Sequence, residues 1–123
     1  MKEVFWVGLG GFLGANARYF VAGWVATRVG SIFPYGTLLI NATGSFALGV
    51  LMGLAETSIV SPTIRLGLGI GFLGAYTTFS TFSYETLRLA EDGSLLLAAA
   101  NAVGSVTISL LAALAGLLLG RAL

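Results

Sequence analysis

Four apolar stretches, each about as long as a helix that crosses a lipid bilayer, account for most of this chain. They cover residues 4–27, 35–55, 64–87 and 94–119, and short loops at 28–34, 56–63 and 88–93 join them. A spanning α-helix needs about 20 predominantly apolar residues. Charged residues make up only 9% of the sequence, against about a quarter in soluble domains, so the chain cannot cover a surface that faces water. We therefore expect an all-α integral membrane protein, a single domain of four transmembrane helices.

The first stretch differs from a cleaved signal peptide. Lys2 precedes it, but the apolar run continues past Val21 without a clear small-residue cleavage site. We expect this helix to be retained.

The residue types that the chain lacks narrow its chemistry. It has no cysteine and no histidine, which excludes disulfides, thiol chemistry and the usual zinc, haem and iron–sulfur ligand sets. No pairing of nucleophile and base is visible, so we expect no enzyme. A net charge of +1 gives no reason to expect a nucleic-acid partner.

Positive charges are spread almost evenly between the two sides of the predicted bundle. If both termini lie on one side, that side holds Lys2, Arg65 and Arg121, and the other holds Arg28 and Arg88. An excess of Lys and Arg on the cytoplasmic side normally fixes orientation. This balance fits two arrangements equally: a chain with one weakly preferred orientation, or a chain that inserts both ways and forms an antiparallel homodimer.

Glycines recur four residues apart in every apolar stretch. The pairs are Gly10/Gly14, Gly49/Gly53, Gly67/Gly71 and Gly116/Gly120. In lipid this spacing lets helix backbones approach closely. The pairs predict a compact bundle and say nothing of what the bundle does.

A polar run interrupts the third stretch at residues 77–83, just after Gly71 and Gly74. Irregular or polar backbone is tolerated at membrane depth only where it is buried in protein or lines a cavity. We therefore expect the third helix to be broken in mid-membrane. A break would leave carbonyl oxygens around residues 74–78 without helical partners, and a bound cation would satisfy them. In a two-fold dimer, two such breaks could share one ion.

Polar side chains form stripes on two other helices. Thr37, Asn41 and Ser45 share one face of the second stretch, and the fourth stretch repeats the pattern with Asn101, Ser105 and Ser109. Such stripes either hydrogen-bond between helices or line a permeation path. Together with the break they favour a path, and their amide and hydroxyl donors suit a small anion.

Phe79 and Phe82 lie three residues apart on the polar run, and Arg18 lies inside the first stretch. The edge of a phenyl ring is electropositive, so rings presented edge-on could help to hold an anion. Ordinary packing is the alternative for both rings. Arg18 either attracts anions into a vestibule or extends to the membrane interface.

The sequence resembles the Fluc (CrcB) fluoride-channel family over its whole length. The motifs that carry the resemblance are GGFLGA at 10–15, Asn41 followed by GSF at 44–46, and GFLG at 71–74 leading into TTFSTFSYE at 77–85. The third motif is the most specific of them. Ala75 stands where the family often has a second glycine.

The resemblance implies a passive, fluoride-selective channel in the plasma (inner) membrane of a microbial cell, where it exports cytoplasmic fluoride and relieves its toxicity. It implies a multi-pass, dual-topology homodimer with two antiparallel pores. The roles it implies for single residues are fluoride contact for Phe79 and Phe82, an amide donor at Asn41, a polar track of Thr81, Ser105 and Ser109, an aqueous approach at Arg18, and backbone carbonyls of Gly74 and Thr77 on a central structural Na⁺.

Two other functions fit a short four-helix membrane protein. A small multidrug-type, proton-coupled antiporter would need a carboxylate in mid-membrane, but Glu85 lies near the end of its stretch. A non-transporting assembly subunit would use the glycines and hydroxyls for packing alone, which leaves the polar break unexplained.

Overall fold

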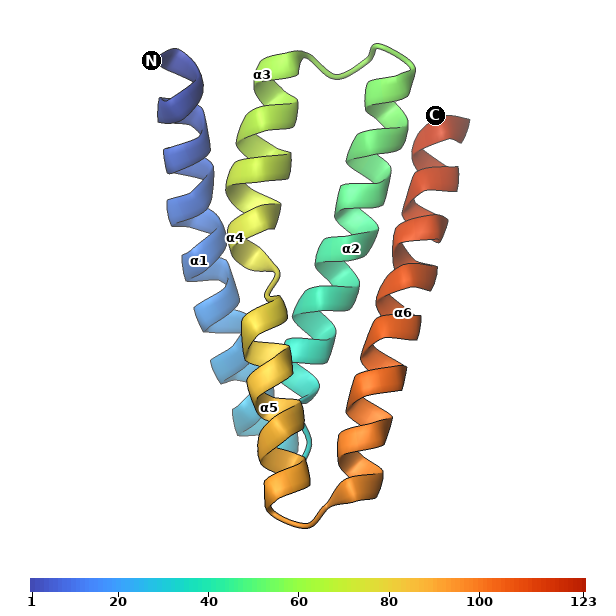
Figure 1. The fold of residues 1–123 in the computed structure, drawn as a ribbon. Helices are drawn as coiled ribbons and strands as arrows, with labels where there is room; N and C mark the ends of the chain where they lie inside the picture. Colours follow the sequence, from blue (N-terminus) through green and yellow to red (C-terminus); the bar gives the residue numbers. More distant parts are fainter.

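The computed structural model describes all 123 residues, and all of its secondary structure is helical, with both termini at the same end of the bundle (Figure 1). Three long helices are α1 (Lys2–Val29), α2 (Tyr35–Glu56) and α6 (Leu95–Ala122). The third apolar stretch is divided into α3 (Pro62–Ile64), the π-helical segment η1 (Arg65–Leu73), α4 (Gly74–Tyr76) and α5 (Phe79–Glu91). The prediction of an all-α fold is confirmed.

Proline, serine and glycine set several helix ends. Pro34 immediately precedes α2, and Pro62 opens α3 behind Ser61, whose hydroxyl accepts a hydrogen bond from the amide of Ile64 at 3.3 Å. Gly30 and Gly93 both have φ of 79°, a left-handed conformation that glycine adopts without steric cost. These turns bring successive helices back antiparallel to one another.

Two helices, α2 and α6, are each long and apolar enough to cross a membrane. Only 11% of the most apolar 18-residue segment of α6 is buried inside the chain. Most apolar side chains of this segment therefore face outwards rather than into a core. The third stretch contains no single long helix, because the chain is extended between α4 and α5.

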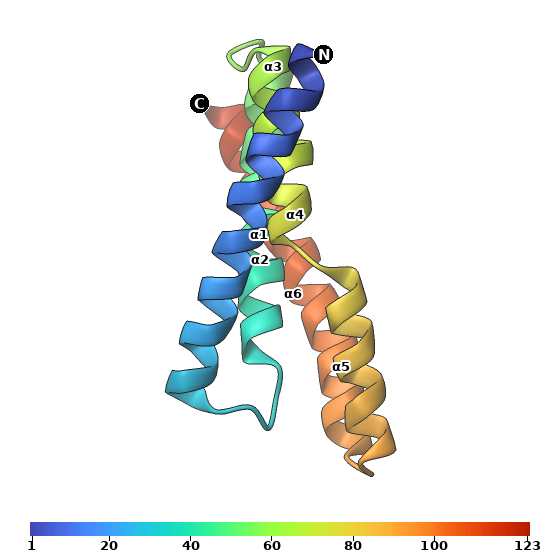
Figure 2. The same ribbon diagram turned by 90° about the vertical axis from the view of Figure 1, so that its left-hand side faces the viewer.

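The interrupted third stretch changes its packing partner along its length. Its first half, η1 and α4, packs against α1, whereas α5 packs against α6. Figure 2 shows α5 running beside α6 and away from α1 at the end opposite the termini. The interruption therefore carries the chain from one side of the bundle to the other.

The glycine pairs meet each other in two interfaces. A methyl group added at Gly10 of α1 would overlap the carbonyl oxygen of Gly67 in η1, and one added at Gly14 would overlap that of Phe72. On the other side of the bundle, Gly49 and Gly53 of α2 face the backbone of α6, and Gly116 and Gly120 of α6 face the backbone of α2. The predicted close approach of helix backbones is confirmed, and it joins α1 to η1 and α2 to α6.

We expect Gly116→Ala to lower the stability of the fold, because the added methyl group would overlap the carbonyl oxygen of Phe46. Overpacking of this kind costs about 1–3 kcal/mol. Gly104→Ala on the same helix is the matched control, since nothing lies within 4 Å of a methyl group there. Thermal unfolding of both variants in detergent tests this expectation. Equal unfolding temperatures for Gly116→Ala and Gly104→Ala would show that the α2–α6 contact does not depend on glycine.

Candidate functional site

The site is built around two extended residues, Thr77 and Thr78, between α4 and α5. Thr77 has ψ of 159°, and Thr78 has φ of −151° and ψ of 122°. Thr77 ends α4 with its hydroxyl donating to the carbonyl of Leu73 at 2.8 Å. Thr78 caps α5, because its hydroxyl oxygen accepts a hydrogen bond from the amide of Thr81 at 3.2 Å. The two threonines thus end one helix and begin the next.

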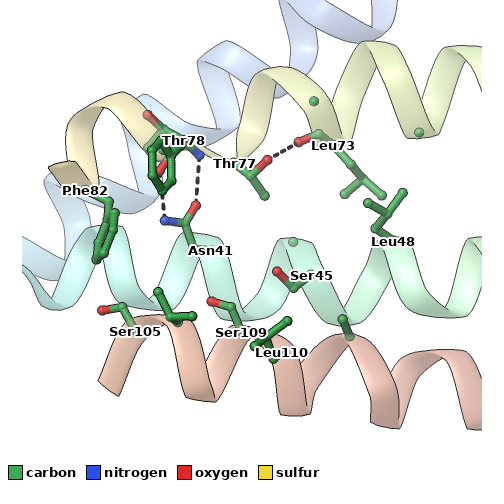
Figure 3. Close-up of a pocket in the computed structure, with 16 residues that line it drawn as sticks. Asn41, Ser45, Leu48, Leu73, Thr77, Thr78, Phe82, Ser105, Ser109 and Leu110 are labelled. Atoms are coloured by element: carbon green, nitrogen blue, oxygen red, sulfur yellow. Dashed lines mark hydrogen bonds between the residues drawn. The ribbon is translucent and has the colours of Figure 1, made fainter. Parts of the chain in front are cut away.

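Asn41 of α2 holds this interruption in place. Its Nδ2 donates to the carbonyl oxygen of Thr78 at 2.9 Å, and its Oδ1 accepts from the amide of Thr78 at 2.8 Å (Figure 3). One side-chain amide therefore satisfies both backbone polar groups of Thr78. The family resemblance implies that Asn41 is an amide donor to a passing anion; in the structure its amide is bonded to Thr78 at the break.

The interruption releases the two backbone carbonyls, those of Gly74 and Thr77, that the family resemblance places on a Na⁺. In a continuous helix the amide of Thr78 would donate to Gly74, and that of Thr81 to Thr77. Here the amide of Thr78 donates to Asn41 Oδ1, and the amide of Thr81 donates to the hydroxyl of Thr78. No other backbone amide is bonded to the carbonyls of Gly74 and Thr77. The carbonyl oxygens of Gly74 and Thr77 are thus free to bind a ligand.

A cavity of about 430 Å³ lies beside the interruption and runs between α2 and α6. Its lining contains most of the predicted site residues: Asn41, Gly74, Thr77, Phe79, Phe82, Ser105 and Ser109. Figure 3 shows Ser105 and Ser109 on α6 and Asn41 and Ser45 on α2. No lining residue carries a charge, and the remaining surface is largely Leu, Val, Ala and Gly.

The two aromatic rings of the polar run lie together at this cavity. The centroids of Phe79 and Phe82 are 5.6 Å apart and their planes are inclined by 44°. Phe79 is 77% exposed in the single chain, although it lines the cavity. A ring placed this way is not packed into the core of its own chain.

Two predicted site residues lie outside the cavity lining. Thr81 turns its hydroxyl oxygen to the hydroxyl of Thr78, from which it accepts a hydrogen bond at 3.0 Å. Arg18 is half-buried on α1 and is not among the lining residues. The structure therefore groups the aromatic rings, Asn41 and the α6 serines around one cavity, and Thr81 and Arg18 are not part of its lining.

Glu85 is a carboxylate near the end of the third apolar stretch. The structure pairs this residue with Thr37, whose hydroxyl donates to Glu85 Oε1 at 3.0 Å, while Oε2 is buried without a partner. Both residues line a second cavity of about 380 Å³ near the loop that joins α1 to α2.

Two polar residues of the site were not assigned a role from the sequence, Thr78 and Thr86. Thr78 caps α5 and binds Asn41. Thr86 joins α5 to α6 by accepting a hydrogen bond from Asn101 Nδ2 at 2.8 Å. The position of Thr78 directly before Phe79 is the signal that could have marked it, since threonine is a preferred N-cap residue.

Outward-facing apolar helices around an uncharged, partly polar cavity define a small helical membrane protein. The family described as CrcB-like protein, Camphor Resistance (CrcB) matches residues 5–117, and the chain belongs to this family. The resemblance found in the sequence is thereby confirmed.

Curated relatives share one name, "Fluoride-specific ion channel FluC". The relative from Geotalea uraniireducens is 47% identical over 124 residues, which covers all of both chains. The one from Geotalea daltonii is 50% identical over 111 residues, covering 89% of this chain and 90% of its own. The one from Geobacter sulfurreducens is 44% identical over 124 residues and again covers both chains fully.

Proposed function

We propose that this chain forms a passive, fluoride-selective ion channel. The observation that carries the proposal is the cavity in which Asn41, Phe79, Phe82, Ser105 and Ser109 meet without any charged side chain. Its polar groups are amide and hydroxyl groups and its aromatic rings lie beside the break, which suits a small anion. The names of the relatives point to the same ion.

Fluoride is small and strongly hydrated, so a path for it must replace its water with closely spaced donors. Hydrogen fluoride crosses membranes as a neutral molecule and ionises inside near neutral pH. A passive exit then prevents accumulation, because a negative-inside potential drives the anion outwards by about 2.3 kcal/mol per 100 mV. Through this exit the channel relieves fluoride toxicity. The name of the relatives, an ion channel, agrees with a role that is not enzymatic.

The channel works as an antiparallel homodimer with two pores. Phe79 supports this, because a pore-lining ring that is 77% exposed in one chain needs a second chain to complete its surroundings. The nearly even distribution of Lys and Arg between the two ends of the bundle allows both orientations.

A structural Na⁺ at the dimer interface binds the carbonyl oxygens of Gly74 and Thr77. Both carbonyls lack helical donors in the single chain, and hard cations prefer oxygen ligands. Two chains related by a two-fold axis would supply these carbonyls twice. The ion would offset the cost of leaving backbone oxygens unpaired within a bilayer.

The dimer lies in the plasma (inner) membrane, and each chain crosses it four times, through α1, α2, the interrupted third stretch and α6. The break then lies in mid-membrane, where Asn41 satisfies its backbone groups. Arg18 attracts anions to a vestibule outside the cavity.

The cavity does not favour a proton-coupled antiporter, because it contains no carboxylate. Efflux of fluoride and of chloride from liposomes that carry the purified protein tests the channel directly.

A further inference from the structure

A chain of three hydrogen bonds leads from the cavity to α5 and back to the cavity. Ser105 Oγ donates to Asn101 Oδ1 at 2.9 Å, Asn101 Nδ2 donates to Thr86 Oγ1 at 2.8 Å, and Thr86 Oγ1 donates to the carbonyl of Phe82 at 2.8 Å. We call these residues the relay. Its two ends, Ser105 and Phe82, both line the cavity.

The relay has a direction, and that direction is set at Thr86. The single proton of the Thr86 hydroxyl goes to the carbonyl of Phe82, so Thr86 is an acceptor toward Asn101. Asn101 must therefore present its nitrogen to Thr86 and its oxygen to Ser105. Ser105 in turn gives its only proton to Asn101 and has only lone pairs left for the cavity.

This arrangement is unsuited to an anion beside Ser105. An anion needs a hydrogen-bond donor, and the one donor that Ser105 owns points away from it. Asn101 is 1% exposed and Ser105 is 4% exposed, so water cannot easily take over a bond that is broken. Rotating Ser105 alone would leave a buried amide oxygen unpaired, which is costly.

Reversing the whole relay avoids that cost. If the Asn101 amide turns over, Thr86 donates to Asn101 Oδ1, Asn101 Nδ2 donates to Ser105 Oγ, and the Ser105 proton is free for the cavity. The oxygen and nitrogen of an amide have nearly the same shape, so the turned side chain fits the same buried space. The Phe82 carbonyl still has a partner, because the amide of Thr86 is its regular helical donor in α5.

We propose that Asn101 is a positioning residue whose amide reverses when fluoride occupies the cavity. The reversal changes the role of Ser105 toward the cavity from acceptor to donor. This inference rests on the proposed function, since it assigns a response to fluoride within the same cavity. Every polar group of the relay stays hydrogen-bonded in both directions, which allows fast exchange as the ion passes.

Asparagine side-chain NMR provides a direct test. The chain contains three asparagines, Asn16, Asn41 and Asn101, so protein labelled with ¹⁵N-asparagine gives a simple spectrum in micelles. We expect sodium fluoride to shift the Asn101 side-chain signals and sodium chloride to leave them in place. Asn16 is the internal control, because its amide donates only to the carbonyl of Phe12 in its own helix.

Ser105→Ala removes the proton that the anion would recruit, while Ser105→Thr keeps a hydroxyl. We expect the alanine variant to lose the fluoride-dependent shift of Asn101 and to conduct fluoride about tenfold more slowly, and the threonine variant to retain both. Size-exclusion chromatography establishes that each variant is folded.

Unmoved Asn101 signals in a preparation that conducts fluoride would overturn the relay, as would a shift that persists in Ser105→Ala. A wild-type protein that conducts no fluoride would sink the proposed function instead. In that case the fluoride dependence of the Asn101 signals would still decide whether the amide reverses.

Discussion

Replacing either aromatic ring of the polar run by isoleucine is expected to cut fluoride flux sharply while the protein stays folded. Phe79 and Phe82 line the cavity with ring centroids 5.6 Å apart. Isoleucine keeps the apolar character but has no electropositive ring edge. Aromatic quadrupole interactions contribute about 0.5–1.5 kcal/mol, so we expect each substitution to slow conduction by about tenfold. Fluoride efflux from liposomes measures the loss.

Phe12→Ile is the matched control for these two variants. Phe12 is also strongly exposed in the single chain, but it lies on α1 outside the cavity lining, so its replacement should leave flux unchanged. Unaltered flux in both Phe79→Ile and Phe82→Ile would show that the rings only pack.

Substitution of Asn41 by aspartate is the second change with a large expected effect. A carboxylate can accept from the amide of Thr78 but cannot donate to its carbonyl, which is 2.9 Å from Nδ2 in the native chain. The variant therefore loses one bond that holds the break and places a negative charge in the path of an anion. An unpaired buried group costs about 1–3 kcal/mol, and the charge adds to this, so we expect flux to fall by about a hundredfold.

Asn41→Leu separates the two causes, because it removes both bonds to Thr78 without adding a charge. We expect this variant to conduct poorly as well, since the break loses its partner on α2. Normal flux in Asn41→Leu together with lost flux in Asn41→Asp would mean that charge alone matters and that the bonds to Thr78 do not position the site.

The sequence predicts the helical fold well, because its apolar stretches and glycine pairs report on lipid and on helix contact directly. It cannot indicate which glycine pair meets which, since the spacing is the same in every stretch. The pairing of α2 with α6 and of α1 with η1 depends on the fold as a whole. The π-helical form of residues 65–73 also has no local signal that we recognise.

Within the candidate site, residue types were easier to predict than their bonds. Asn41 is recognisable as a polar residue on an apolar helix, but its partner is a backbone group 37 positions away in the sequence. The resemblance implies a polar track that includes the hydroxyls of Thr81 and Ser105, and in the structure each of these hydroxyls also forms a hydrogen bond within its own chain. A hydroxyl can both donate and accept, so only the structure shows which neighbours it selects.

Fluoride efflux from liposomes that carry the purified protein, in the presence of a potassium ionophore, tests the central claim most directly. We expect fast release of fluoride and no release of chloride under the same conditions. Absence of fluoride release from folded protein, or equal release of both anions, would contradict the assignment of a fluoride-selective channel.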